Sequence, residues 1–152
     1  MSDLKPGDPA PAFDMPTDDG RVSLAALKGK SVVLYFYPKD DTPGCTTEAQ
    51  AFTALAADFA KAGAVVVGVS RDTAAKHGKF RDKYGLNVLL GADEDGSVTE
   101  AYGVWVEKTL YGRQYMGIER ATFLIGPDGV IRQVWRKVKV AGHAESVLAA
   151  LG

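Results

Sequence analysis

An uninterrupted apolar run and the polar loop behind it occupy positions 32–48, which read Val32-Val33-Leu34-Tyr35-Phe36-Tyr37-Pro38-Lys39-Asp40-Asp41-Thr42-Pro43-Gly44-Cys45-Thr46-Thr47-Glu48. The first six residues are β-branched, aliphatic or aromatic, which predicts a central strand buried on both faces. Pro38 ends this strand because proline cannot donate a hydrogen bond to a sheet. Thr42 is a good helix N-cap and Pro43 a good first helical residue, so a helix follows the loop directly.

The residues after this loop predict a helix, a second strand and a second helix. The first helix has one apolar face, formed by Phe52, Leu55, Ala56 and Phe59. The run 64–69 predicts a second buried strand. Asp72 can cap the second helix, and Gly85 can end it. This order of elements predicts two parallel strands joined by a right-handed crossover.

The remaining elements complete a layered α/β arrangement. Runs 121–125 and 130–135 flank Gly126-Pro127-Asp128-Gly129, which predicts an antiparallel hairpin, and a closing helix follows with Val147 and Leu151 on its core side. Asp18-Asp19-Gly20 predicts a small N-terminal hairpin. The predicted fold is α/β and thioredoxin-like, with a mixed central β-sheet flanked by helices and an N-terminal β-hairpin extension. We expect residues 1–152 to form one such domain.

Composition limits the functional classes. The 152 residues are 46% hydrophobic and 24% charged, with a net charge of −1, so we expect neither nucleic acid nor a membrane as a partner. The apolar runs have strand length, far below a membrane span. The N-terminal residues carry no apolar run typical of a secretory signal. A single cysteine suits a reducing compartment, and we expect a cytoplasmic protein.

Cys45 is the candidate nucleophile. It falls in the first turn of the predicted helix, where free backbone N–H groups and the helix dipole favour an anion. The thiolate is the reactive form of cysteine. Cys45, Ala49 and Phe52 share one helix face, so the sulfur should be partly shielded. From these residues alone, an inert buried thiol remains the alternative.

The same segment resembles the peroxiredoxin family. Its pattern Pro38-x-x-x-Thr42-x-x-Cys45 is the family motif, and residues 37–46 are similar to the bacterioferritin-comigratory (PrxQ) branch. Further blocks of similarity follow in the expected order, namely Leu89-Leu90, 93–96, 101–105, Glu107-Lys108 and 120–125.

This resemblance implies a peroxidase that needs no cofactor and no metal, and that reduces hydrogen peroxide and organic hydroperoxides. It implies that Cys45 is the peroxidatic thiolate and that Thr42 offers its hydroxyl to the peroxide. Pro38 is expected to pack over the sulfur and limit water, and Arg120 to hold the thiolate and the peroxide oxygens. Asp40 and Asp41 act the other way, because nearby carboxylates disfavour a thiolate.

The sequence departs from its relatives in having no second cysteine. Many of them carry one five residues after the first, where this chain has Gln50. Others carry one in the following helix near Phe80, where Arg81 and its neighbours in this chain supply no sulfur. An external thiol must therefore reduce the sulfenic acid at Cys45, and thioredoxin, glutaredoxin, glutathione or another small thiol are the alternatives. We expect a monomer or a weak homodimer.

Two other functions compete with this interpretation. A thiol–disulfide oxidoreductase would need Cys-x-x-Cys, but Thr46, Thr47 and Glu48 follow Cys45. A thioredoxin-like binding module without catalysis remains the second alternative.

Overall fold

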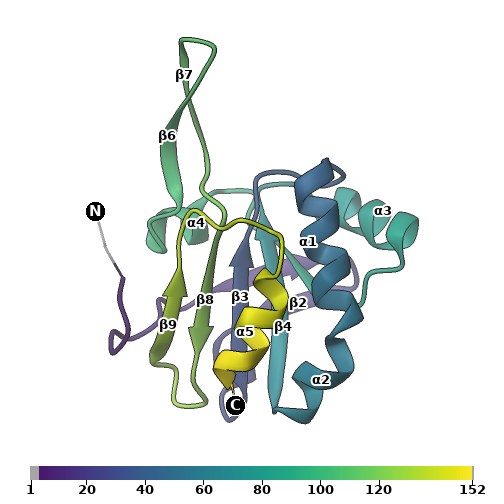
Figure 1. Ribbon diagram of the computed structural model, residues 1–152, viewed down its shortest axis with the longest axis vertical. Helices are drawn as coiled ribbons and strands as arrows, with labels where there is room; N and C mark the ends of the chain where they lie inside the picture. Colours follow the sequence, from purple (N-terminus) through teal and green to yellow (C-terminus); the bar gives the residue numbers. More distant parts are fainter. Residues whose placement is uncertain (1–3, 152) are drawn as a thin grey trace.

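The structure is a computed structural model that describes residues 4–151. Its elements run in the order β1 (Asp14–Thr17), β2 (Gly20–Ser23), η1 (Ala25–Leu27), β3 (Ser31–Phe36), α1 (Pro43–Ala54), α2 (Ala56–Lys61), β4 (Ala64–Ser70), α3 (Ala74–Tyr84), β5 (Leu89–Ala92), α4 (Ser97–Ala101), β6 (Trp105–Leu110), β7 (Arg113–Ile118), β8 (Ala121–Ile125), β9 (Ile131–Trp135) and α5 (His143–Leu151). Five of the strands form one sheet in the order β5-β4-β3-β8-β9 (Figure 1).

The central position of β3 is confirmed. This strand pairs in parallel with β4 and antiparallel with β8, so the sheet is mixed. All six residues from Val32 to Tyr37 are buried. The reason is their composition, since a strand with apolar side chains on both faces gains most when both faces are covered.

Helices and hairpins cover opposite faces of the sheet. Val33, Tyr35 and Tyr37 point into a core shared with α1, α2, α3 and α5. The alternate residues of β3 point into a second core with the N-terminal hairpin and α4. Figure 1 shows α1, α2 and α5 in front of the sheet, with the purple N-terminal segment crossing behind it. These layers confirm the predicted α/β fold with its N-terminal β-hairpin.

The other predicted turns lie where the sequence placed them. β1 and β2 pair antiparallel around residues 18–19, and β8 pairs with β9 across the Gly126–Gly129 turn. In that turn the Gly129 N–H donates to the Gly126 carbonyl over 2.9 Å. Gly85 ends α3 in the left-handed conformation that favours glycine, with φ 61°.

The predicted cap of α3 is wrong by one residue. Thr73, not Asp72, is the N-cap, and its side chain accepts from the Lys76 N–H. The Asp72 carboxylate is already occupied by the Ser70 hydroxyl and by the backbone N–H of Asp40. Long-range partners therefore outweigh the local cap at Asp72.

The first long helix is also not continuous. It ends at Ala54, and α2 begins at Ala56 after Leu55 leaves helical geometry with φ −100° and ψ 11°. The Leu55 N–H donates to the Phe52 carbonyl, which tightens the last turn of α1. The predicted apolar face survives this break, since both Phe52 and Phe59 are buried.

The sequence interpretation missed the hairpin of β6 and β7, which projects beyond the sheet in Figure 1. Its turn has two consecutive residues with positive φ, Tyr111 and Gly112, a geometry that suits tight hairpins. The large hydrophobic side chains that are exposed in the described part of the chain all lie on this hairpin, namely Leu110, Tyr111, Tyr115 and Met116.

Among residues 4–151 none of the helices is long and apolar enough to cross a bilayer.

One glycine in β4 supports the central core directly. A Cβ at Gly68 would lie 2.6 Å from Cζ of the Tyr35 ring, which is itself fully buried. Gly68→Ala should therefore lower the free energy of unfolding by about 1–3 kcal/mol, the usual cost of overpacking. Gly20→Ala is the matched control, because no atom lies within 4 Å of a Cβ there. Urea denaturation measures both, and equal stability of the two variants would contradict this account of Gly68.

Candidate active site

Cys45 lies where the sequence placed it, in the first turn of α1. The loop 37–42 connects the carboxyl end of β3 to this helix, and Thr42 occupies the N-cap position before Pro43. The thiol is buried, with 2% of the residue exposed. Because the first-turn N–H groups of a helix have no partners within the helix, Gly44 and Cys45 present theirs near the sulfur.

Arg120, the residue just before β8, reaches this thiol. The residue after it, Ala121, pairs with Phe36 at the end of β3, and this register sets Arg120 beside the loop. Its Nη2 lies 3.4 Å from the Cys45 Sγ. A Cβ at Gly44 would lie 3.2 Å from the same nitrogen, so the glycine leaves room for the guanidinium. A fixed cation at this distance favours the thiolate.

Glu48 is the second partner of Arg120, and the sequence analysis assigned it no role. Its Oε1 accepts from the Arg120 Nη1 over 2.7 Å, while its Oε2 is buried without a partner in the described chain. Only 1% of the side chain is exposed. Burial raises the pKa of Glu48 from 4.5 to about 7, although the Arg120 cation acts in the opposite direction. The signal in the sequence was its position three residues after Cys45, on the same side of the helix.

Thr42 and Pro38 belong to the loop that leads to the thiol. The Thr42 hydroxyl makes no capping bond and instead donates to the Lys39 carbonyl over 2.8 Å. Its lone pairs are therefore free to accept a hydrogen bond. Pro38 lies at the start of the loop and is exposed. Its shielding of the sulfur stays a prediction.

Lys108 is a second cation near the thiol, and the sequence did not indicate a role for it. Lys108 of β6 is half-buried, and its aliphatic chain lies close to Gly117 on β7. Burial lowers the pKa of Lys108, the Arg120 guanidinium lowers it further, and Cys45 acts in the opposite direction. Lys108, in the middle of β6, thus adds positive charge near the Cys45–Arg120 pair.

Both loop acids have partners on α3. Asp41, which has φ 58°, accepts from the Tyr84 hydroxyl over 2.6 Å and from the Lys83 ammonium over 2.9 Å. These two hydrogen bonds lower the pKa of Asp41. Asp40 is buried between Tyr37 and His77. The expected opposition of these acids to the thiolate is therefore moderated by their neighbours.

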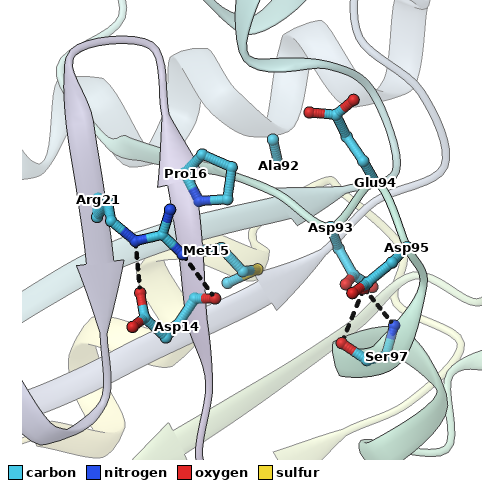
Figure 2. Close-up of a pocket in the computed structure, with 9 residues that line it drawn as sticks. All are labelled: Asp14, Met15, Pro16, Arg21, Ala92, Asp93, Glu94, Asp95 and Ser97. Atoms are coloured by element: carbon cyan, nitrogen blue, oxygen red, sulfur yellow. Dashed lines mark hydrogen bonds and ion pairs between the residues drawn. The ribbon is translucent and has the colours of Figure 1, made fainter.

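A hollow between β1 and the β5–α4 connection is distinct from this site. Figure 2 shows its lining, which carries four acidic side chains but none of the predicted site residues. Asp14 pairs with Arg21, and Asp95 accepts from the Ser97 hydroxyl. Asp93 accepts from two backbone N–H groups at the start of α4. Asp93 and Asp95 thus hold the backbone at the start of α4, and Asp14 is paired with an arginine.

The two places where the family resemblance implies a second cysteine hold Gln50 and Arg81 in this chain. Gln50 is exposed on α1. Arg81 on α3 donates to both carboxylate oxygens of Asp18 over 2.6 and 3.1 Å, and to the Leu86 carbonyl. Cys45 is the one cysteine of the chain.

The sheet is thioredoxin-like, and it presents a buried thiol at a helix N-terminus beside an arginine. This arrangement is that of an enzyme in which a cysteine thiol is the reacting group. The family model described as AhpC/TSA family matches residues 6–134. The chain is 51% identical over 146 residues to peroxiredoxin Bcp of Xanthomonas campestris, covering 94% of this chain and 91% of that protein.

Solved structures agree with this match. The bacterioferritin comigratory protein of Xanthomonas campestris, studied for its alkyl peroxide reduction activity, has a TM-score of 0.87 and 49% identity over 91% of this chain and 89% of that one. A cysteine-to-serine variant of PrxQ from Xylella fastidiosa has a TM-score of 0.92 and 41% identity, covering 99% and 97% of the two chains. The chain belongs to the AhpC/TSA family, in its peroxiredoxin Bcp branch, and is a thiol-dependent peroxidase.

The buried carboxyl of Glu48 should make stability depend on pH. Because its pKa is about 7 in the folded chain against 4.5 in the unfolded one, its contribution is fully present below pH 4.5 and is lost as the pH rises through about 7. Relative to Glu48→Gln, the wild-type protein should lose up to about 3 kcal/mol of stability across this window. Chemical denaturation between pH 4.5 and 8 measures the difference. Parallel curves for the two proteins would contradict the raised pKa.

Proposed function

We propose that Cys45 is the peroxidatic residue and that Arg120 and Thr42 act with it on the peroxide. The observation that carries this proposal is the 3.4 Å contact between the Cys45 sulfur and the Arg120 guanidinium inside a buried helix start. A structural thiol has no need of a partly buried cation. A nucleophilic thiolate needs one, because burial by itself disfavours the charged form.

The reaction proceeds by attack of the thiolate on one peroxide oxygen. A sulfur–oxygen bond forms while the O–O bond breaks, and the departing oxygen takes a proton and leaves as water or an alcohol. Negative charge grows on that oxygen during the step. The Arg120 guanidinium and the first-turn N–H groups can stabilise this charge, since they are already oriented before the reaction.

The proposed role of Thr42 is to align the peroxide. Because its hydroxyl proton is committed to the Lys39 carbonyl, its oxygen can accept the O–H of the incoming peroxide. This orients the second oxygen toward the sulfur. Pro38 is proposed to limit water at the entrance to the thiol.

The product at Cys45 is a sulfenic acid that needs an external thiol. One thiol condenses with it to a mixed disulfide and releases water, and a second thiol displaces the first and restores the Cys45 thiol. We propose thioredoxin, glutaredoxin, glutathione or another small thiol as the donor. The exposed Gln50 and the ion-paired Arg81 support an external donor, because neither can supply sulfur.

We further propose that the chain works as one domain, as a monomer or weak homodimer, in the cytoplasm. Both packed cores share the five-stranded sheet, which supports a single domain. The single free cysteine supports a reducing compartment.

The Arg120 guanidinium should strongly accelerate the oxidation of Cys45 by peroxide. Arg120→Ala is expected to slow oxidation of Cys45 by hydrogen peroxide on the order of 100-fold, because one charge-stabilising donor is lost. Stopped-flow oxidation and alkylation with iodoacetamide at pH 7 measure the effect. Cys45→Ser should abolish turnover while keeping the fold. Arg132→Ala, at an exposed arginine paired with Asp128, is the matched control and should react at the wild-type rate. An Arg120→Ala rate equal to that of this control would refute the role of Arg120.

The missing second thiol predicts the product of one turnover. After limited peroxide treatment without reductant, intact mass spectrometry should show the gain of one oxygen, or of two where peroxide was in excess. Added glutathione should convert the first species into a mixed disulfide at Cys45. A covalent dimer through Cys45 as the main product would show resolution between subunits instead.

A further inference from the structure

The acid five residues before Cys45 is part of a buried network that the catalytic scheme does not use. The side chain of Asp40 is 5% exposed and that of His77 is fully buried. The Asp40 Oδ1 lies 2.5 Å from the Tyr37 hydroxyl, and its Oδ2 lies 2.6 Å from the His77 Nδ1. The other ring nitrogen of His77 lies 3.0 Å from the Gly91 carbonyl. Each polar atom of the two side chains therefore has one close partner.

The partners determine how many protons the network holds. A carbonyl oxygen can only accept, so the His77 Nε2 carries a proton toward Gly91. Burial raises the pKa of Tyr37 well above its ordinary value, so Tyr37 keeps its proton and donates to Asp40. The remaining contact, between the Asp40 Oδ2 and the His77 Nδ1, needs one proton between two atoms that otherwise repel. The pair is either carboxylate with imidazolium or carboxylic acid with neutral imidazole, and its net charge is zero in both forms.

Other charged groups face the pair from the elements around it. Lys76, Lys79 and Lys83 of α3 line the same hollow as Asp40 and Asp41, and Lys83 is paired with Asp41. Asp72 accepts from the Asp40 N–H and lies 3.9 Å from the Lys76 ammonium. Asp18 of the β1–β2 turn, which is near His77, is paired with Arg81. The Tyr35 hydroxyl also lies within electrostatic reach of both Asp40 and Cys45. Among the described residues, the hydrogen bonds to the Asp40 carboxylate come from Tyr37 and His77, and none comes from these other groups.

We propose that His77 is a positioning residue of the peroxidase, because the proton it shares with Asp40 neutralises the loop acid that would otherwise oppose the Cys45 thiolate. The same contact fastens the loop 37–42 to α3. The inference rests on the proposed role of Cys45 as the nucleophile. It explains how an acidic loop can lead into a helix start that must stabilise an anion.

The test measures the thiolate without any turnover. In His77→Phe the proton shared with Asp40 is lost together with the ring, which leaves a carboxylate that still accepts from Tyr37 but has no charge partner on the ring. The midpoint of the pH profile for Cys45 alkylation should therefore rise by about one pH unit. Alkylation at a pH below the midpoint should become about tenfold slower. In His77→Gln, whose side chain is polar but cannot carry a charge, the alkylation midpoint should also rise. This second variant keeps the test valid if the phenylalanine variant fails to fold.

Two matched variants separate charge from packing. In Asp40→Asn the amide can still accept from Tyr37 and donate to the His77 Nδ1, so the network stays neutral and the midpoint should equal the wild-type value. The double variant with His77→Phe and Asp40→Asn should return to that value although the histidine is gone. A purely structural role for His77 would not be rescued by this second change.

Two outcomes overturn the proposal. One is an unchanged midpoint in both His77 variants. The other is a lower midpoint in Asp40→Asn alone, which would mean that Asp40 carries an uncompensated charge in the wild-type protein. Failure of the proposed function looks different, since peroxide turnover would then persist in Cys45→Ser whatever the alkylation profiles show.

Discussion

A single guanidinium, that of Arg120, connects the sulfur of Cys45 to the carboxylate of Glu48 beneath the surface. Its two terminal nitrogens lie 3.4 Å from the first and 2.7 Å from the second. One cation thus faces two groups that can each be an anion. Burial raises the pKa of Glu48 to about 7, so at neutral pH this carboxyl is protonated in about half of the molecules, and in those it does not compete with the thiolate for the guanidinium. The geometry depends on the antiparallel register of β3 and β8, which brings Arg120 to the end of the central strand.

The loop that carries Thr42 and leads to Cys45 is held from the opposite side by α3. His77 contacts Asp40, while Lys83 and Tyr84 contact Asp41. The contact of Asp40 is buried, whereas the two contacts of Asp41 are exposed, and together they restrain the loop. This restraint is consistent with a residue of positive φ at Asp41, which costs conformational energy that surrounding contacts must offset.

The same helix carries Arg81, close to where the family resemblance implies a second thiol. Arg81 binds Asp18 of the N-terminal hairpin and the carbonyl of Leu86, and so connects α3 to the edge of the molecule. With no internal sulfur to capture the sulfenic acid, α3 has no part in forming a disulfide. Its contacts instead serve the shape and charge of the loop before Cys45.

The sequence by itself determined the elements whose patterns are local. The apolar run 32–37, the turn residues of both predicted hairpins and the Thr42-Pro43 helix start each specify their structure through nearest neighbours, and the motif around Cys45 placed the thiol correctly. Only the tertiary structure decided the cap of α3, because Asp72 is engaged by Asp40 from 32 residues away. The same holds for Glu48, Lys108 and His77, whose sequence neighbours are ordinary. Folding brings these residues close to Arg120, Cys45 and Asp40, and these neighbours determine their electrostatic environment. An electrostatic partner that is distant in the sequence leaves no periodic pattern along the chain.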